Sequence, residues 1–287
     1  MKLVNLNESQ LLTNIEDIAN YLNDEFGYDK KVGVDKDGNV TVYNDLVIYK
    51  SKTPLRIKLK STKSLEISYT YAKHLSSFLP EIATDLKIAW CNYLESHINI
   101  TTHVPDYWIN VEHCETIQAI ETLSPKIFVI DCKSFNGLLH TSTADTSAIV
   151  INSCPKIYRF SQCNTKAHLT HLVFENCFLE TLENFNIKTN NLSIARCQSI
   201  KDCSGIENLN ATEMLRLDIY PHMTRHLINI LLNTSPKLTT TYKDFEKDTL
   251  ENIMLEYEGK NISKRANYIM DCAVELIDAG FEEAAEL

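Results

Sequence analysis

Glycine is scarce in this sequence, at only 7 of 287 residues. Loops that hold phosphate groups need glycine, because a residue without a side chain lets the backbone approach the ligand closely. No phosphate-binding loop, dinucleotide-binding fingerprint or Gly-x-Ser-x-Gly turn occurs in the chain. The sequence therefore argues against nucleotide-dependent enzymes and against serine hydrolases, and we expect no cofactor.

Long apolar runs and an excess of positive charge are also missing. No stretch approaches the roughly 18 apolar residues that a membrane-spanning helix needs, and the N-terminus leads into a polar, amphipathic segment rather than a signal peptide. We therefore expect a cytoplasmic protein that does not enter a membrane. The chain holds 28 Lys and Arg against 38 Asp and Glu, a formal net charge of −10, which opposes binding to nucleic acid.

One short phrase recurs between residues 86 and 220: two aliphatic residues two positions apart, then a cysteine three positions later. The ladder positions are 18 to 23 residues apart, at Cys91, Cys114, Cys132, Cys154, Cys177, Cys197 and Tyr220. A phrase at nearly constant spacing is typical of a solenoid, in which each repeat buries its apolar face against the next. Residues two apart in a strand share one face, so the aliphatic pairs predict the core side of a parallel sheet. The cysteine side chain is expected to point into the same core, where it packs as a small hydrophobic residue.

The phrase resembles the leucine-rich repeat, whose core is Leu-x-x-Leu-x-Leu-x-x-Asn/Cys-x-Leu. The copy that fills all five positions consists of Leu169, Leu172, Phe174, Cys177 and Leu179. The resemblance is to divergent, cysteine-containing repeats and implies an α/β solenoid with a parallel sheet of about seven coils. Its return segments, of about a dozen residues, are expected to be helical or irregular. Another kind of parallel β-solenoid is the alternative architecture.

Cysteine usage indicates a reducing environment. Six of the nine cysteines belong to the ladder, and the others are Cys163, Cys203 and Cys272. A column of inward-pointing cysteines is not a disulfide framework, so we expect reduced thiols, as in the cytoplasm. Abundant Asn, Lys and Ile favour an AT-rich genome, such as that of a phage or of certain bacteria.

Both ends of the chain depart from the repeat. Residues 1–74 combine a helical pattern around Leu11 with alternating strands, including a hairpin at Asp37-Gly38, and predict an α+β unit or cap with an antiparallel meander. Residues 75–220 are the predicted solenoid. Residues 221–287 predict a C-terminal helical cap, with helices ending at Gly259 and Gly280.

Charge is unevenly distributed. Residues 51–74 hold six basic residues and one acidic residue, and the candidate basic patch consists of Arg56, Lys58, Lys60 and Lys63. Such a patch can contact nucleic acid or an acidic partner. Lysine also protects exposed strand edges, and we favour that interpretation because the whole protein is acidic. Residues 243–287 hold twelve acidic and five basic residues, which we interpret as solvated helix surface.

Histidine and cysteine form no strong catalytic or metal-binding pattern. His168 with His171, and His222 with His226, have spacings that a metal site can use. No Cys-x-x-Cys or His-Glu-x-x-His arrangement occurs, however. A nucleophilic cysteine needs a partly exposed thiol of low pKa, and Cys163 and Cys203, off the ladder, are the candidates. We therefore expect no metal and no catalytic residues.

The outward face of the sheet is the remaining candidate site. Residues that alternate with the buried aliphatics point away from the core. They predict an apolar centre with a polar rim, the centre being Phe128, Ile130, Val150 and Val173 and the rim Glu112, Asn152, Glu175, Arg216 and Asp218. This arrangement is typical of protein-binding surfaces. The alternatives are a terminal element that covers the patch, or ordinary exposed sheet.

We therefore expect a non-enzymatic solenoid that binds a partner protein on its sheet face. By analogy, such a protein in a phage or an AT-rich bacterium is an effector or inhibitor of a host protein. The alternative is a catalytic or nucleic-acid-binding N-terminal unit carried by a solenoid recognition domain.

Overall fold

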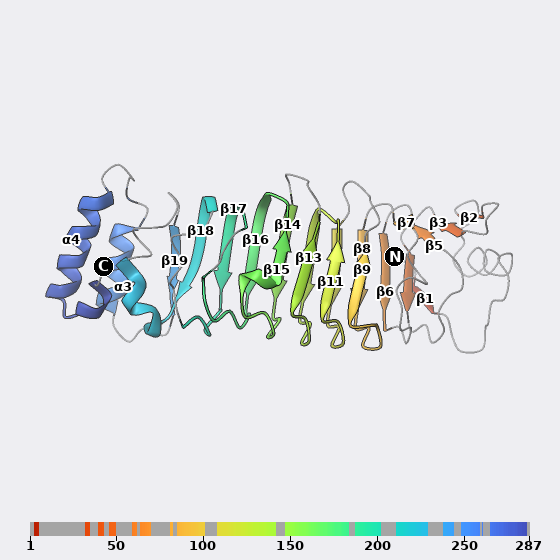
Figure 1. The fold of residues 1–287 in the computed structure, drawn as a ribbon, viewed down its shortest axis with the longest axis horizontal. Helices are drawn as coiled ribbons and strands as arrows, with labels where there is room; N and C mark the ends of the chain where they lie inside the picture. The colour runs from red at the N-terminus through yellow and green to blue at the C-terminus, as the bar shows by residue number, and fades with distance from the viewer. Residues whose placement is uncertain are drawn as a thin grey trace. The chain divides into compact units, whose positions relative to one another are not determined.

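The fold is known from a computed structural model (Figure 1). The structure describes residues 3–5, 32–34, 40–42, 46–49, 59–61, 64–69, 81–82, 85–100, 108–141, 147–183, 187–201, 211–228, 238–243, 248–258, 260 and 265–285. The chain divides into two compact units, Met1–Ser142 and Thr143–Leu287. It is a parallel β-solenoid with a C-terminal helical region, as the sequence predicts, and it has about six turns where about seven coils were expected.

The principal sheet of the first unit contains only parallel strands. In spatial order they are β1 (Leu3–Asn5), β4 (Leu46–Tyr49), β6 (Ser64–Ser68), β8 (Asp85–Ala89), β10 (Trp108–Glu112) and β12 (Lys126–Ile130). Equivalent positions of the repeated phrase are paired, with Leu86 opposite Ile109 and Ile109 opposite Ile127. The aliphatic pairs therefore set the register, because a slip of one residue would turn them all to the other face.

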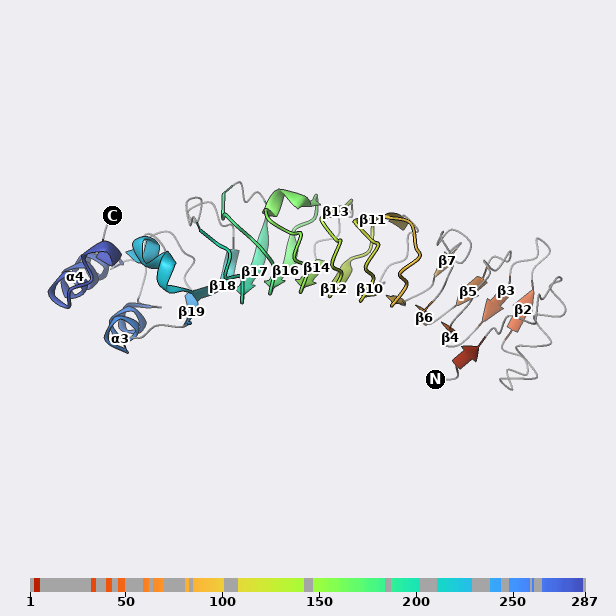
Figure 2. The same ribbon diagram turned by 90° about the horizontal axis from the view of Figure 1, so that it is seen from below.

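The return segments of this unit also form strands. β9 (His97–Ile100), β11 (Ala119–Thr122) and β13 (Gly137–His140) pair in parallel, as do β3 (Val40–Val42), β5 (Leu59–Ser61) and β7 (Glu81–Ile82). Figure 2 shows β10 and β12 on one side of the unit and β11 and β13 on the other.

The expected helical or irregular return is therefore wrong for these coils. The reason lies in the period of the buried residues. Ile98 and Ile100 are both buried, and so are Ile120 and Thr122. A period of two places both members of each pair inward from a strand, whereas a helix needs a spacing of three or four. A return this short is also too short to nucleate a helix easily.

The core of the first unit lies between its two faces. The aliphatic pairs of β8, β10 and β12 are fully buried, together with the ladder cysteines and Phe135. Burying each large aliphatic side chain contributes roughly 1.5 to 3 kcal/mol relative to exposing it. No single coil buries its own side chains, so stability comes from stacking.

The N-terminal strands correct the sequence interpretation. Among the described strands, only β2 (Val32–Val34) and β3 form an antiparallel pair, which is the expected hairpin. β4 pairs in parallel with β6, and β6 with β8, so the meander is wrong and the parallel sheet continues across residue 74. Leu46 with Ile48 and Leu65 with Ile67 repeat the aliphatic pair without the cysteine. The helix expected around Leu11 lies outside the described residues.

The second unit continues the same kind of coil. Its parallel strands are β14 (Ser147–Asn152), β16 (Leu169–Glu175), β17 (Thr189–Ala195), β18 (Ala211–Ile219) and β19 (Leu238–Tyr242). The return after β14 contains the short helix η2 (Phe160–Gln162) and β15 (Cys163–Thr165). Phe160 of this return packs edge-on against Phe174, with ring centroids 5.3 Å apart.

The C-terminal end of the second unit is helical. It contains η4 (Pro221–His226), α3 (Asp248–Tyr257), α4 (Arg265–Asp278) and η6 (Glu282–Ala285). Helix α4 ends as predicted at Gly280, whose φ is 84°. The Phe281 N–H donates to the Leu276 carbonyl (2.7 Å) and the Gly280 N–H to the Ile277 carbonyl (2.9 Å), which together form a Schellman motif.

Candidate functional site

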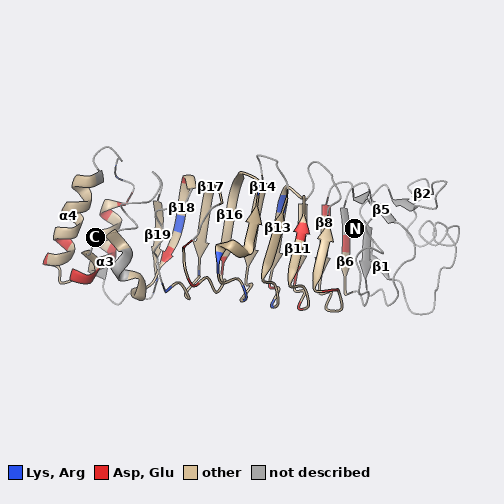
Figure 3. Ribbon diagram, viewed as in Figure 1, with Lys and Arg blue, Asp and Glu red and all other residues tan. Residues whose placement is uncertain are grey.

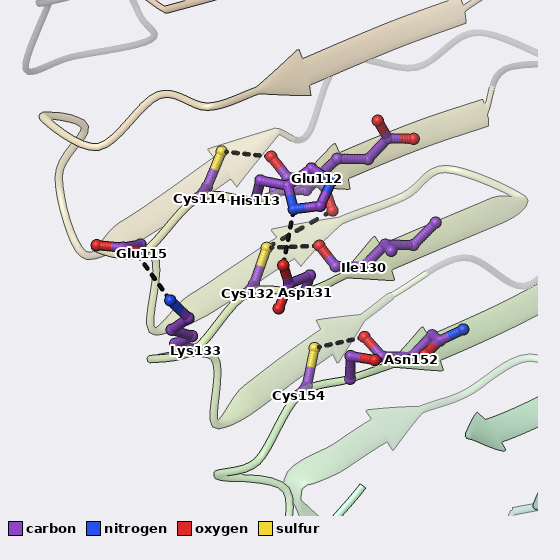
Figure 4. Close-up of polar contacts among 12 residues, drawn as sticks. Glu112, His113, Cys114, Glu115, Ile130, Asp131, Cys132, Lys133, Asn152 and Cys154 are labelled. Atoms are coloured by element: carbon purple, nitrogen blue, oxygen red, sulfur yellow. Dashed lines mark hydrogen bonds and ion pairs between the residues drawn. The ribbon is translucent and has the colours of Figure 1, made fainter. Parts of the chain in front are cut away.

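The ladder cysteines lie inside the coils at the ends of the strands. All six are buried, at 0–2% exposed, which confirms the prediction, and the eight cysteines that the structure describes are free thiols. Each Sγ faces the carbonyl two residues earlier, as Cys114 does with Glu112 at 3.2 Å (Figure 4). Most also face a carbonyl of the preceding coil; the distance from Cys91 to Ile67 is 3.4 Å. The single S–H proton can serve one carbonyl at a time.

Burial makes Cys177 and Cys197 poor nucleophiles. It raises the pKa of Cys177 to about 11 and the pKa of Cys197 to about 12. Burial likewise raises the pKa of Cys163, one of the two candidate nucleophiles, which is 1% exposed. Because the thiolate is the reactive form, Cys163 is a structural residue. Cys203 lies outside the described residues.

The residue before each ladder cysteine has a left-handed backbone. Its φ lies between 49° and 55°, in Trp90, His113, Asp131, Ser153, Asn176 and Arg196. In four of them the N–H donates to a carbonyl of the next coil, for example from Trp90 to Glu112 at 3.0 Å and from Asn176 to Ala195 at 2.9 Å. The Arg196 N–H donates to the Asp218 carboxylate instead. This conformation is unfavourable for bulky side chains. The inter-coil hydrogen bond and the buried cysteine that follows hold it in place.

In the first unit these turns carry a stack of rings. Trp90 lies between Tyr69 and His113, at centroid distances of 5.2 and 4.8 Å with nearly parallel planes. His113 Nδ1 is 2.8 Å from Asp131 Oδ2, which extends the row by one coil (Figure 4). Sequence reasoning missed this row. The sequence does mark these residues, because Trp90, His113 and Asp131 each stand directly before a ladder cysteine.

The outward face of the first unit carries the predicted apolar residues. Phe128 and Ile130 of β12 alternate with buried neighbours and are partly exposed. Trp108 of β10, which the sequence analysis did not select, meets Phe128 edge-on with centroids 6.3 Å apart. Beside them, Glu112 accepts a hydrogen bond from Asn110 Nδ2 (2.6 Å) and pairs with Lys87 Nζ (3.0 Å). The face therefore combines an apolar cluster with a paired carboxylate.

The outward face of the second unit has the same composition. Val150 and Val173 are opposite one another on β14 and β16 and are partly exposed. Asn152 Nδ2 donates to Glu175 Oε2 at 3.0 Å, and Arg196 Nη1 lies 3.4 Å from Glu175 Oε1. Arg216 of β18 is exposed. Figure 3 shows that most of this sheet is uncharged.

One rim prediction is wrong. Asp218 is only 3% exposed, and its Oδ2 accepts a hydrogen bond from the Arg196 N–H at 2.8 Å. Its Oδ1 has no hydrogen-bond partner among the residues that the structure describes. The equivalent residues Ala89 and Ala195 are also buried. In the other coils this position holds Glu112, Ile130, Asn152 and Glu175, which are partly exposed. Asp218 differs from them because its carboxylate turns back to bond the backbone of the neighbouring turn.

The remaining candidates gain no further support. Arg56, Lys58 and Lys63 lie outside the described residues. For Lys60, the structure describes the backbone, in β5, but not the side chain. Within the described part of the chain, no three His, Cys, Asp or Glu side chains cluster as a metal site requires. His168 and His171 are exposed, while His222 Nε2 lies 2.7 Å from the Ile200 carbonyl oxygen.

Comparisons of this chain with protein-family models, curated proteins and solved structures found no match. Neither α3 nor α4, nor any other helix among the described residues, has the length and apolar character of a membrane span. What can be said of function therefore depends on the chain's own side chains.

Proposed function

We propose that this protein is a non-enzymatic solenoid that binds a partner protein on the outward face of its parallel sheet. The observation that supports this most is the cluster of Trp108, Phe128 and Ile130, which remains partly exposed on the face opposite the core. Aromatic side chains surrounded by paired polar groups are the usual anchors of protein interfaces. In the second unit, Val150 and Val173 provide a similar apolar area beside the Asn152–Glu175 pair.

The polar groups of both faces are suited to specificity. Glu112 and Glu175 already have partners in the free protein, so a partner does not have to desolvate isolated carboxylates there. Arg216 is exposed and available for contacts at the edge. Charges in such positions influence association rate and partner choice more than affinity.

For the repeat itself, we propose a divergent, cysteine-containing leucine-rich repeat in the strand and the turn that follows it. The support is the pairing of the ladder thiol with carbonyls of its own and the preceding coil, as in Cys132 with Ile130 (3.5 Å) and Val111 (3.6 Å). The cellular role that fits this function is a cytoplasmic effector or inhibitor of phage or bacterial origin.

Capture of the partner from extracts of the native host, followed by identification by mass spectrometry, tests the proposal. The parent protein is compared with Val150→Asp and Val173→Asp, which place a charge in the outward face. We expect one protein to be retained by the parent and lost with both variants. Retention by both variants would contradict the proposal. Loss on removal of residues 1–74, in a truncated protein whose remaining coils still unfold cooperatively, would favour an N-terminal catalytic or nucleic-acid-binding unit.

A further inference from the structure

Helix α4 carries two apolar rows, and only one of them is buried. Ile269, Cys272, Ala273 and Leu276 form the buried row. Met270, Val274 and Ile277 are 55%, 54% and 50% exposed. Their spacing of four and then three residues places them on one face of the helix. Exposed apolar side chains in a continuous row, rather than scattered singly, mark an interaction site.

A row of carboxylates runs beside this apolar row. Each exposed apolar residue is followed by an acidic one, at Asp271, Glu275 and Asp278. Glu275 accepts a hydrogen bond from the Tyr257 hydroxyl at 2.5 Å. No hydrogen bond or ion pair of Asp271 or Asp278 is found within the described part of the chain. Figure 3 shows acidic positions along both α3 and α4.

We propose that the outer face of α4 (Met270, Val274 and Ile277, with Asp271 and Asp278 beside them) docks a basic amphipathic helix of a partner protein. The apolar row offers a ridge against which the apolar stripe of a second helix packs. The carboxylates complement Lys or Arg beside that stripe. Residues 265–283 hold five acidic residues and one basic residue, so a complementary partner must be positively charged.

The same charges disfavour two other occupants. Two antiparallel copies of α4 would bring both carboxylate rows to the same side of the contact, where they repel one another. Helices that lie on membranes carry Lys and Arg beside the apolar face, because the headgroups are often anionic. Asp271 and Asp278 oppose such a surface. A cationic helix meets neither the repulsion between carboxylate rows nor the repulsion by anionic headgroups, and it covers the apolar row.

Binding of two synthetic helical peptides to the full chain tests this proposal. Both peptides carry Leu at every third or fourth position, and the remaining positions are Lys in one peptide and Glu in the other. Fluorescence anisotropy at physiological salt measures the affinity. We expect the full chain to bind the Leu/Lys peptide and not the Leu/Glu peptide.

Three variants locate the contact. Val274→Ser is expected to weaken binding of the Leu/Lys peptide about tenfold or more, as the loss of a central apolar contact does. The matched control is Leu255→Ser on α3, which changes a similarly exposed aliphatic residue (45%) and should leave affinity unchanged. The double variant Asp271→Lys and Asp278→Lys should reverse the preference toward the Leu/Glu peptide. Both carboxylates are exposed, so this variant remains informative even if Val274→Ser does not fold.

Four results would overturn the proposal. The first is failure of the Leu/Lys peptide to bind the parent. The second is equal binding by the charge-reversed variant. The third is self-association of the parent in sedimentation that Val274→Ser abolishes, since a second copy would then occupy the face. The fourth is binding to phosphatidylserine vesicles that depends on Val274.

Discussion

At the scale of single residues, the left-handed backbone before each ladder cysteine is predicted by its position in the repeat and not by its residue type. Asp131, Asn176 and His113 are residue types that adopt this conformation with some frequency, whereas Trp90 and Arg196 are not. Propensity therefore does not predict these turns. The position relative to the cysteine does, because every coil must turn there to donate the N–H to its neighbour. Trp90 and His113 were missed because the repeated phrase does not specify their side chains.

Backbone strain at this turn gives a first prediction. Asn176 has a φ of 52° and an exposed side chain whose Nδ2 donates to Ser153 Oγ at 3.0 Å. Replacement by Gly or Ala removes this side-chain bond equally, but only Ala has a Cβ that opposes the left-handed conformation. We expect Asn176→Ala to be about 1 kcal/mol less stable than Asn176→Gly in chemical unfolding. Equal stabilities would show that the turn is not held in this conformation in solution.

The buried thiols give a second prediction, which concerns pH. Burial raises the pKa of Cys197 and the pKa of Cys272 to about 12, whereas an unfolded cysteine titrates near pH 8.5. The unfolded chain therefore loses protons first, and the stability from these thiols is complete below about pH 8.5 and falls as pH rises towards 12. Urea unfolding between pH 8 and 10.5 measures this.

The control is Cys272→Ala, which removes one titrating thiol. This variant should be less stable overall because of its cavity, but should lose less stability between pH 8 and 10.5 than the parent. An identical loss in both proteins would mean that the Cys272 thiol is not protected in the native state.

At the scale of elements, the strands of the repeat and the two C-terminal helices were predictable because a buried period of two, or of three to four, specifies each one. The return strands of the first unit were not, since pairs such as Ile120 and Thr122 are too short a signal to distinguish a strand from an irregular segment. The parallel pairing of β4 and β6 was missed for a different reason. These strands share the aliphatic pair but not the cysteine, and pairing direction depends on the course of the whole coil rather than on the strand's own residues.

The junction of α3 with β19 gives a third prediction. Glu258, just beyond α3, accepts hydrogen bonds from Thr240 Oγ1 and from the Tyr242 hydroxyl, the latter at 3.1 Å. Burial raises the pKa of the Glu258 carboxyl, although the hydrogen bonds from the Tyr242 hydroxyl and the Thr240 N–H oppose the shift. The folded protein therefore holds this proton more tightly than the unfolded chain does, so stability from Glu258 rises as pH falls from neutral towards its ordinary pKa.

Two substitutions separate the charge of Glu258 from its hydrogen bonds. Glu258→Gln keeps an acceptor oxygen without the buried charge, and should match or exceed the parent's stability at pH 7. Glu258→Ala removes the acceptor of the Thr240 and Tyr242 hydroxyls, and should cost about 1 to 3 kcal/mol. Thermal unfolding at pH 5 and pH 7 measures both. A Gln variant as unstable as the Ala variant would show that the carboxylate itself is required.

At the scale of the whole molecule, the repeated phrase was sufficient for the solenoid and for the side of the sheet to which Phe128, Ile130, Val150 and Val173 point. It was not sufficient for the rim, since Asp218 is buried at a turn. Nor was it sufficient for the apolar cluster, since Trp108 lies just before the repeated phrase. The register is encoded by many aliphatic residues acting together. The contacts of the face depend on which single side chains neighbour one another, and that follows only from the pairing of strands.

The central claim is that the outward sheet face binds a partner protein. The affinity of the partner captured from the host for variants of the first unit tests this claim most directly. Phe128→Ala removes the aromatic ring from the outward face, while Leu139→Ala removes a comparably sized apolar side chain, 38% exposed, from the second face of the same unit. Thermal unfolding first establishes that both variants fold. Isothermal titration calorimetry should then show binding weakened by roughly 1 to 4 kcal/mol for Phe128→Ala and unchanged for Leu139→Ala. Unchanged affinity for a folded Phe128→Ala variant, or an equal loss in both, would contradict the assignment of the outward sheet face as the binding surface.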